Sequence, residues 1–276
     1  TIQEWRGEAL LKDNFPLIYT VGAGSEYKPR FLEITYGQST DPALTIVGKG
    51  VCFDTGGLDI KPSSGMRLMK KDMGGAAHAV ALAKWIMAEQ LPLSLRLLLP
   101  IVENSLSQRA MRPSDIVKAR NGLTVEIDNT DAEGRLILAD ALSYATEQRC
   151  DLLINIATLT GAARVALGPE LPALFSNDDH LANILLAAGE QADDPLWRLP
   201  LHRGYQSWIE PDIADLANSA KYPQGGAITA ALFLEHFIAQ KESLPFAHID
   251  VMAWNIRQRP GRPIGGEAMG LRALFN

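Results

Sequence analysis

The 276-residue sequence contains only two cysteines, Cys52 and Cys150. Two thiols are too few for a disulfide framework or for a zinc site built from cysteines. The five histidines are scattered, and no two of them have the spacing of a common histidine zinc motif. Any metal ion would therefore have to be held mainly by carboxylates.

Long hydrophobic runs are also absent. The most apolar stretch, residues 91–102, contains Arg96 and Pro100 and is shorter than the ~20 residues that span a bilayer. Charged side chains are spread through the first 13 residues, so we expect no signal peptide at this end. The first residue is Thr1 rather than Met, which is compatible with processing or truncation. We therefore expect a cytoplasmic protein that has no membrane partner.

Positive charge is in the minority, with 26 Lys and Arg against 32 Asp and Glu and a net charge of -6. Such a protein gains no long-range attraction to nucleic acid, so we expect no nucleic-acid partner. Hydrophobic residues make up 47% and charged residues 21% of the chain. This balance is typical of a globular protein and excludes a disordered or coiled-coil chain.

Apolar runs with strand patterns alternate with helical patterns. Strands are predicted at residues 16–21, 31–36, 44–47, 93–102, 151–156 and 245–251, and helices at 74–90, 136–148, 181–191 and 228–238. Residues 116–119 and 123–127 flank Asn121-Gly122, a strong hairpin turn. The alternation predicts an α/β fold with a central mixed, mostly parallel sheet flanked by helices on both faces. Because no repeat or low-complexity linker interrupts it, we expect residues 1–276 to form a single domain.

Two segments place polar side chains directly after predicted strands, where open α/β sheets bind ligands. The first runs from Gly48 through Asp54 and Lys61 to Gly75, with glycine pairs flanking a charged loop. Asp72 precedes the predicted helix 74–90, where a carboxylate can cap a helix. The residues alone do not decide whether Asp72 is such a cap or has a functional role. The segment contains no P-loop, nucleophile elbow or dinucleotide fingerprint.

The second segment, residues 129–136, has the sequence NTDAEGRL. Asp131 and Glu133 are two residues apart, and in extended backbone such side chains point the same way. Two carboxylates on one face repel unless a cation or a proton lies between them. The alternative is that the two carboxylates simply form an acidic helix N-terminus, with Arg135 as an ion-pair partner. The spacing does not decide between a bound cation and this alternative.

These segments resemble the signature regions of the leucyl aminopeptidase (cytosol aminopeptidase) family of two-metal exopeptidases. Residues 129–136 match the family's signature octapeptide without a substitution, and residues 48–57, Lys61 and residues 72–75 match its other metal-binding stretch. Residues 158–162, TLTGA, add a third match. The resemblance runs from about Tyr19 to Leu271 and corresponds to the family's C-terminal catalytic domain. We therefore expect the family's separate N-terminal domain to be absent from this chain.

The resemblance implies a site for two divalent metal ions. One ion would be held by Lys49, Asp54, Asp72 and Glu133, and the other by Asp54, Asp131 and Glu133. Mn²⁺ and Zn²⁺ suit this ligand set, and Mg²⁺ is a further candidate. Lys49 must lose its proton to act as a ligand, which burial and adjacent cations would favour.

The implied reaction is hydrolysis of the N-terminal peptide bond of peptides by a hydroxide that bridges the metals. Lys61 would stabilise the oxyanion, and Arg135 would hold a bicarbonate ion that serves as general base. Further substrate contacts would come from Met69, Asn129, Thr158, Leu159 and Gly161, with Met252 as a weaker candidate. Methionine and threonine walls suit an apolar first residue such as Leu.

Alternative functions are a dipeptidase, such as a Cys-Gly hydrolase, and a non-catalytic scaffold or DNA-binding relative. An enzyme is favoured because the seven expected polar positions are all intact. These positions are Lys49, Asp54, Lys61, Asp72, Asp131, Glu133 and Arg135. The resemblance also implies a homo-hexamer built as a dimer of trimers. We expect His248 to be a core histidine, and Trp254 to be a core or interface side chain.

Overall fold

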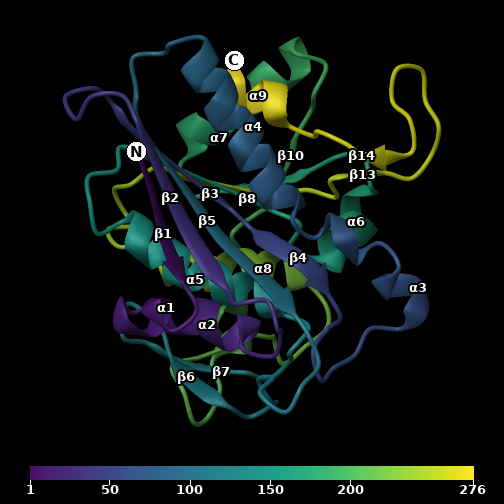
Figure 1. Ribbon diagram of the computed structural model, residues 1–276. Helices are drawn as coiled ribbons and strands as arrows, with labels where there is room; N and C mark the ends of the chain where they lie inside the picture. Colours follow the sequence, from purple (N-terminus) through teal and green to yellow (C-terminus); the bar gives the residue numbers. More distant parts are fainter.

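The computed structural model describes residues 1–276 and contains a nine-stranded mixed sheet (Figure 1). Its strands are β1 (Ile2–Arg6), β2 (Arg30–Tyr36), β3 (Ala43–Gly48), β4 (Gly50–Asp54), β5 (Ser94–Asn104), β8 (Leu152–Ala157), β9 (Ala173–Ser176), β10 (Trp197–Arg198) and β12 (Phe246–Asp250). Their spatial order is β1-β2-β5-β3-β8-β12-β9-β10, with β4 beside β5. The central strands β5, β3, β8 and β12 are parallel to one another. The predicted α/β fold is thereby confirmed.

Helices cover both faces of the sheet (Figure 1). One face carries α4 (Gly74–Ala88), α7 (Asp179–Gln191) and α9 (Leu271–Phe275), and the other carries α2 (Pro16–Gly22), α5 (Glu133–Ala145) and α8 (Gly226–Glu235). Most buried apolar side chains form two hydrophobic clusters, one between the sheet and α4 and the other between the sheet and α5. Successive residues of a central strand contribute to these clusters alternately. Ile46 belongs to the α4 cluster, whereas Val47 belongs to the α5 cluster. Burial on both faces explains why the central strands are continuous apolar runs.

The remaining elements are short and surround this sheet. They are α1 (Ala9–Lys12), α3 (Ser63–Met66), the 3₁₀ helix η1 (Met69–Lys71), β6 (Ile116–Lys118), β7 (Thr124–Glu126), α6 (Gly161–Leu167), the 3₁₀ helix η2 (Arg203–Ile209), β11 (Leu216–Ala217), β13 (Trp254–Asn255) and β14 (Gly265–Gly266). Strands β6 and β7 pair antiparallel, as the Asn121-Gly122 turn predicts. None of the helices has the length and apolar character needed to cross a membrane.

Two sequence predictions of secondary structure are wrong. Residues 16–21, predicted as a strand, form α2 instead. Pro16 occupies its first turn, where a missing N–H costs little, and the N–H groups of Leu17 and Ile18 donate to Asp140 Oδ2. Because Asp140 lies far along the chain on α5, the local pattern contains no sign of this partner. The sequence pattern also predicts no strand directly after Gly48, where the structure has β4, which pairs parallel to β5 and ends at Asp54.

Candidate metal centre and active site

Three neighbouring parallel strands, β3, β8 and β12, end at the same edge of the sheet. Lys49 directly follows β3, Thr158 directly follows β8, and Asp250 is the last residue of β12. This edge lies on the right of Figure 1, near β4, α3 and α6. The structure therefore gathers polar side chains beyond the carboxyl ends of the strands, where α/β sheets bind ligands.

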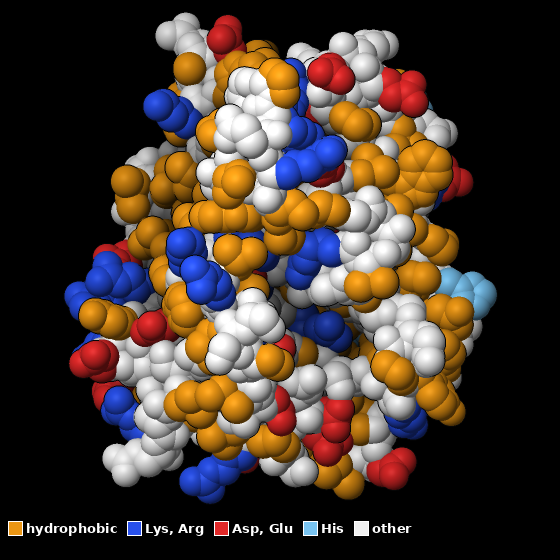
Figure 2. Space-filling view, turned by 90° about the vertical axis from the view of Figure 1, so that its right-hand side faces the viewer, with side chains coloured by type: hydrophobic (Ala, Val, Ile, Leu, Met, Phe, Trp, Pro, Cys, Tyr) orange, Lys and Arg blue, Asp and Glu red, His pale blue; other side chains and the backbone are white.

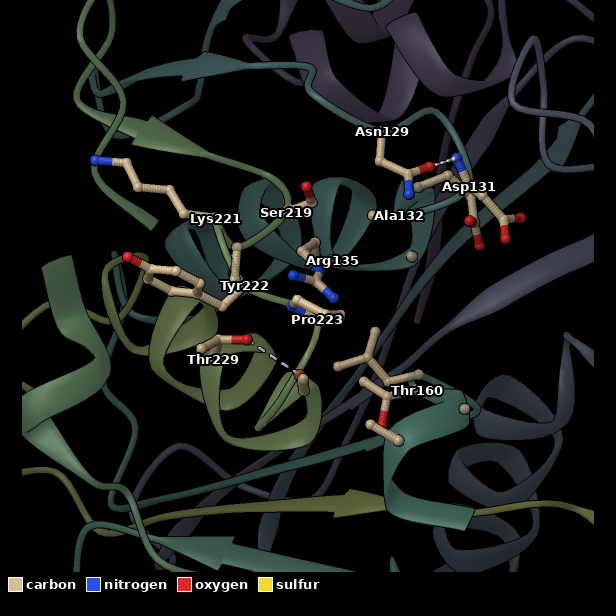
Figure 3. A pocket seen from close by; sticks show the side chains of 17 residues that line it. Asn129, Asp131, Ala132, Arg135, Thr160, Ser219, Lys221, Tyr222, Pro223 and Thr229 are labelled. Atoms are coloured by element: carbon tan, nitrogen blue, oxygen red, sulfur yellow. Dashed lines mark hydrogen bonds between the residues drawn. The ribbon is translucent and has the colours of Figure 1, made fainter. Parts of the chain in front are cut away.

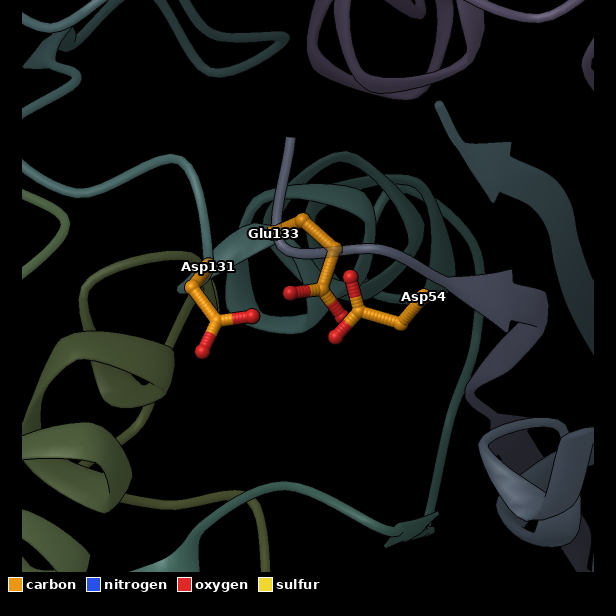
Figure 4. A group of neighbouring side chains, drawn as sticks. All are labelled: Asp54, Asp131 and Glu133. Atoms are coloured by element: carbon orange, nitrogen blue, oxygen red, sulfur yellow. The ribbon is translucent and has the colours of Figure 1, made fainter. Parts of the chain in front are cut away.

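Asp54, Asp131 and Glu133 form a carboxylate cluster at this edge (Figure 4). One oxygen from each carboxylate lies within 4.8 Å of one from each of the others. Asp54 comes from the end of β4, Asp131 from the loop before α5, and Glu133 from the first turn of α5. Asp131 and Glu133 do converge, but the backbone between them is not extended as the spacing argument assumes, since Ala132 has φ −102° and ψ 42° and Glu133 is already helical.

Lys49 and Asp72 extend this cluster. The Nζ atom of Lys49 lies 2.5 Å from Asp72 Oδ2 and 3.2 Å from Glu133 Oε1. The alternative interpretation of Asp72 as a helix cap is wrong, because α4 begins after Met73 and has no side-chain cap. Instead, Asp72 Oδ1 accepts a hydrogen bond of 2.8 Å from the Thr158 hydroxyl. Asp72 therefore joins η1 to the turn after β8.

Lys61 approaches the cluster from its more open side. Its Nζ atom lies 3.0 Å from Asp54 Oδ2 and 2.5 Å from Asp131 Oδ1. The Lys61 side chain is 15% exposed, against 3% for Lys49. Lys61 is therefore the lysine that a ligand in the site can reach.

The carboxylates are held close together at an electrostatic cost. Burial, together with the charge of Asp54, raises the pKa of Glu133 well above its ordinary value. Burial also raises the pKa of Asp131 to about 6. Burial lowers the pKa of Lys49, but the charges of Asp72, Glu133 and Asp54 outweigh this effect and leave that pKa raised. Such a cluster attracts positive charge.

Divalent cations fit this donor set. The cluster offers several carboxylate oxygens in a small space, which is the chemistry that Mn²⁺ and Mg²⁺ prefer and that Zn²⁺ accepts. A cation held by these oxygens would also offset the attraction that keeps Lys49 protonated. Under that condition, the Lys49 amine could itself become a ligand.

Buried polar side chains that the sequence analysis missed hold the two site loops together. Asn104, the last residue of β5, donates from Nδ2 to Asp54 Oδ1 at 2.8 Å and to the carbonyl oxygen of Thr130 at 3.1 Å. Asp59 accepts a 2.7 Å hydrogen bond from the Thr130 N–H. Asn218 accepts two further N–H groups of the same loop through its Oδ1 atom. The one local sign that Asn104 has such a role is its position as a polar residue at the end of an apolar strand.

Gly134 allows Lys49 to reach the cluster. A Cβ atom at position 134 would lie 2.2 Å from Cε of Lys49. Gly56 has a φ of +88°, and a Cβ atom there would lie 3.0 Å from Asp131 Oδ1. Close backbone approach therefore explains the glycine that follows Glu133 in the sequence.

A cavity of about 450 Å³ adjoins the carboxylates (Figure 3). Arg135 reaches into it from α5, and its Nε atom is buried without a hydrogen-bond partner. No carboxylate pairs with this guanidinium, so its interpretation as a simple ion-pair partner is wrong. Burial lowers the pKa of Arg135 to about 10. The donor set of Arg135 is suited to an anion such as bicarbonate.

The predicted substrate-contacting residues divide into two groups. Asn129, Leu159 and Gly161 line the 450 Å³ cavity. Met69 is half-buried on η1, and Thr158 is buried against Asp72. Thr158 lies next to Lys49 and Asp72, because its carbonyl oxygen accepts a hydrogen bond from Lys49 Nζ, and the carbonyl oxygen of Met69 accepts the N–H of Asp72.

The remaining singled-out residues lie on or after β12. Met252 is half-buried just after β12. His248 is buried, and its Nδ1 atom lies 2.6 Å from Asn155 Oδ1, which confirms the expected core histidine. Trp254 is half-buried, with the Lys70 ammonium 5.4 Å from the centre of its ring.

Comparison with known proteins agrees with this geometry. Residues 1–275 match the family described as the cytosol aminopeptidase family, catalytic domain. A probable cytosol aminopeptidase of Rickettsia canadensis (strain McKiel) is 47% identical over 259 residues, which is 92% of this chain and 51% of the relative. One from Syntrophotalea carbinolica is 43% identical over 273 residues, or 98% of this chain and 54% of the relative. The chain thus spans about half the length of the curated relatives it matches.

Solved structures give the same result. The cytosol aminopeptidase from Coxiella burnetii superposes with a TM-score of 0.96 at 54% identity, covering 100% of this chain and 60% of that one. The bottromycin maturation enzyme BotP in complex with Mn superposes with a TM-score of 0.93 at 40% identity, covering 100% of this chain and 61% of that one. The chain belongs to the cytosol aminopeptidase family and corresponds to the catalytic domain of that family.

Proposed function

We propose that this chain carries the catalytic machinery of a metal-dependent aminopeptidase that removes the N-terminal residue of peptides. The observation that carries the proposal is the convergence of Asp54, Asp72, Asp131 and Glu133 around two lysines at one edge of the sheet. Family membership supports it, since the curated relatives are described as probable cytosol aminopeptidases. The adjoining cavity offers room for a peptide.

The proposal includes two divalent metal ions. One would be held by Lys49, Asp54, Asp72 and Glu133, and the other by Asp54, Asp131 and Glu133. When bound, such ions supply Lewis acidity, which polarises a carbonyl group and lowers the pKa of water. Mn²⁺ is favoured because the similar enzyme BotP was solved in complex with Mn, and Zn²⁺ is the second candidate.

The protein side chains would orient and stabilise the reacting peptide. Lys61 would donate a hydrogen bond to the oxyanion that forms at the scissile carbonyl, because its ammonium already projects toward the open side of the cluster. Arg135 would hold a bicarbonate ion in the cavity through its unpartnered guanidinium. The main-chain carbonyl of Leu159 would accept a hydrogen bond from the substrate amide.

The pocket for the first side chain would lie between η1 and the turn after β8. Met69 and Thr158 would form its walls, with Gly161 leaving space at the start of α6 and Met252 closing one side. Apolar walls of this kind favour a first residue such as Leu. We also propose a homo-hexamer and a cytoplasmic location, which the family resemblance implies.

The test is hydrolysis of Leu-p-nitroanilide by protein stripped with EDTA, with and without added Mn²⁺ or Zn²⁺. We expect cleavage that depends on the metal and that is lost when the substrate is N-acetylated, because the reaction requires a free α-amine. Glu133→Gln is expected to abolish it, whereas the matched variant Glu126→Gln on β7 is expected to retain it. Equal cleavage of the acetylated substrate, or no cleavage with any metal by folded protein, would refute the proposal.

A further inference from the structure

A buried carboxylate lies directly behind the turn after β8. The side chain of Asp250, the last residue of β12, is 1% exposed and belongs to neither proposed set of metal ligands. Its Oδ1 atom accepts the N–H of Leu159 at 3.0 Å, and its Oδ2 atom accepts the N–H and the hydroxyl of Thr160 at 3.0 Å and 2.7 Å. Three donors of one turn therefore converge on a single charged side chain.

The same turn contacts the proposed metal ligands on its other side. The carbonyl oxygen of Thr158 accepts a hydrogen bond of 2.9 Å from Lys49 Nζ. The hydroxyl of Thr158 donates to Asp72 Oδ1 at 2.8 Å. Residues 158–160 therefore lie between Asp250 and the metal centre, and a shift of this turn would reach two of the proposed ligands.

The geometry of the peptide bond links these two sets of contacts. In a trans peptide unit, the N–H of one residue and the C=O of the residue before it point in opposite directions, and this chain contains no cis peptide bonds. Because Asp250 accepts the N–H of Leu159, the carbonyl of Thr158 points away from Asp250, and there it meets Lys49. Because Asp250 also accepts the N–H of Thr160, the carbonyl of Leu159 is turned away from Asp250 in the same manner. Two successive carbonyls are thus aimed away from one carboxylate, on the side of the metal centre and of the 450 Å³ cavity that Leu159 lines.

The negative charge of Asp250 strengthens its hold on the turn. Hydrogen bonds to an ionised acceptor are roughly twice as strong as those between neutral groups. The Arg164 guanidinium pairs with Asp250 only at 3.7 Å, which is longer than a hydrogen bond. The hydrogen bonds of this carboxylate therefore go to the turn. An asparagine in its place would offer one acceptor atom in place of two, and its amide nitrogen would meet N–H groups as a second donor.

The turn and Asp250 differ in their access to a substrate. The edge of the sheet that holds the metal centre faces the viewer in Figure 2, where Lys and Arg side chains gather around a hollow. Leu159 and Thr160 line the 450 Å³ cavity at this edge, whereas Asp250 is buried and does not line it. Asp250 can therefore affect a bound peptide only through the turn.

We propose, resting on the proposed function, that Asp250 is a positioning residue for peptide hydrolysis. It holds residues 158–160 so that the Thr158 carbonyl meets Lys49 and the Leu159 carbonyl accepts the N–H of the substrate amide. Its carboxylate touches neither the metal ions nor the substrate. Loss of its charge frees the peptide unit between Leu159 and Thr160 to rotate. Substrates that offer an N–H to this unit then lose more rate than substrates that offer none.

The test compares cleavage of Leu-Ala and of its ester analogue leucyl-L-lactate by Mn²⁺-loaded protein. Leu-Ala offers a single peptide N–H, which the analogue replaces with an oxygen atom, so a change in the ratio of the two kcat/KM values reports on the hydrogen bond to that N–H. Asp250→Asn is expected to lower kcat/KM for Leu-Ala about tenfold or more and to lower the amide/ester ratio several-fold. If the unchanged protein cleaves Leu-Ala and folded Asp250→Asn keeps the ratio, this inference is wrong and the aminopeptidase proposal stands. If the unchanged protein cleaves neither substrate, both fail.

Further variants separate positioning from stability. Asp194→Asn is the matched control, because Asp194 is also buried and accepts two backbone N–H groups, those of Gly270 and Arg272, but does not line the cavity. It is expected to unfold at lower urea concentration and to keep the amide/ester ratio of the unchanged protein. Thr160→Val, which removes one donor to Asp250, provides the test even if Asp250→Asn does not fold, and its ratio is expected to fall. Thr160→Ser keeps the hydroxyl and is expected to recover most of that ratio. Equal losses for Leu-Ala and leucyl-L-lactate in Asp250→Asn, or a ratio that falls as far in Asp194→Asn, would overturn the assignment.

Discussion

At the scale of single residues, the two lysines of the carboxylate cluster differ in their access to solvent. Lys49 is enclosed between Asp72, Glu133 and the carbonyl oxygen of Thr158. Lys61 bridges Asp54 and Asp131 and remains partly exposed. Under the proposed function, the enclosed lysine would be a metal ligand and the more exposed one would contact the substrate.

We therefore predict that Lys61→Ala lowers kcat by about 100-fold or more, the loss typical of removing an oxyanion donor. Its content of bound Mn²⁺, measured by elemental analysis, should stay close to that of the unchanged protein. Lys49→Ala should instead lose metal. A large loss of metal from Lys61→Ala would make Lys61 a ligand or a structural residue and would contradict its proposed role.

Sequence reasoning predicts some of these residues and misses others for a physical reason. The sequence predicts that Asp131 and Glu133 lie together, and the structure shows it, although through the turn that begins α5 and not through extended backbone. The surroundings of Asp72 and Arg135 cannot be decided from the local sequence, which leaves a helix cap and a simple ion pair open as alternatives. Their environments depend on Thr158 and on cavity residues such as Leu159 and Tyr222, which are distant in the sequence and which only folding brings close.

At the scale of elements, long periodic segments such as α4 and β5 are predicted well, whereas α2 and β4 are not. A short apolar run has too few periods to distinguish a helix from a strand. In α2 the decision rests on Asp140, whose carboxylate accepts the N–H groups of Leu17, Ile18 and Arg120. This buried side chain therefore connects α5 to the start of α2 and to the hairpin of β6 and β7.

We predict that Asp140→Ala lowers the free energy of unfolding by about 3 kcal/mol, because it leaves buried N–H groups without a partner. Asp179→Ala is a suitable control, since Asp179 is largely exposed and its ion pair with Arg198 contributes less than about 1 kcal/mol. Urea unfolding followed by circular dichroism measures both variants. Equal, small effects would show that Asp140 does not stabilise the start of α2.

At the scale of the whole molecule, helices close both faces of the sheet and leave neutral histidines in the interior. Burial lowers the pKa of His248 to about 4 and also lowers the pKa of His78. His78 links α4 to the segment before α9, with Nδ1 2.7 Å from the Gly74 carbonyl oxygen and Nε2 accepting the N–H of Met269. Protonation of either ring would disrupt the packing between the sheet and its helices.

The sign of the resulting pH dependence follows from these lowered pKa values. An unfolded histidine titrates near pH ~6.5, so below that pH the unfolded chain binds protons that the folded chain does not. The stability that neutral His248 contributes is therefore present above pH ~6.5 and is lost as the pH falls toward about 4. The predicted slope is up to about 1.4 kcal/mol per pH unit for each buried histidine.

Unfolding by urea in EDTA at several pH values between these limits tests the prediction. His248→Asn should show a shallower pH dependence than the unchanged protein, because its side chain does not titrate there. His180→Asn, at an exposed position on α7, should keep the original slope. A slope that is the same in all three proteins would show that His248 does not govern acid stability.

The central claim is that the cluster of Asp54, Asp72, Asp131 and Glu133 binds two divalent metal ions. Calorimetric titration of EDTA-stripped protein with Mn²⁺ tests it most directly. The account predicts that two ions bind per chain. Because Glu133 belongs to both ligand sets, Glu133→Gln should weaken the binding of both ions. Because Asp72 belongs to one set, Asp72→Asn should weaken the binding of one ion. Absence of saturable binding by folded protein, or binding that Glu133→Gln leaves unchanged, would contradict the account.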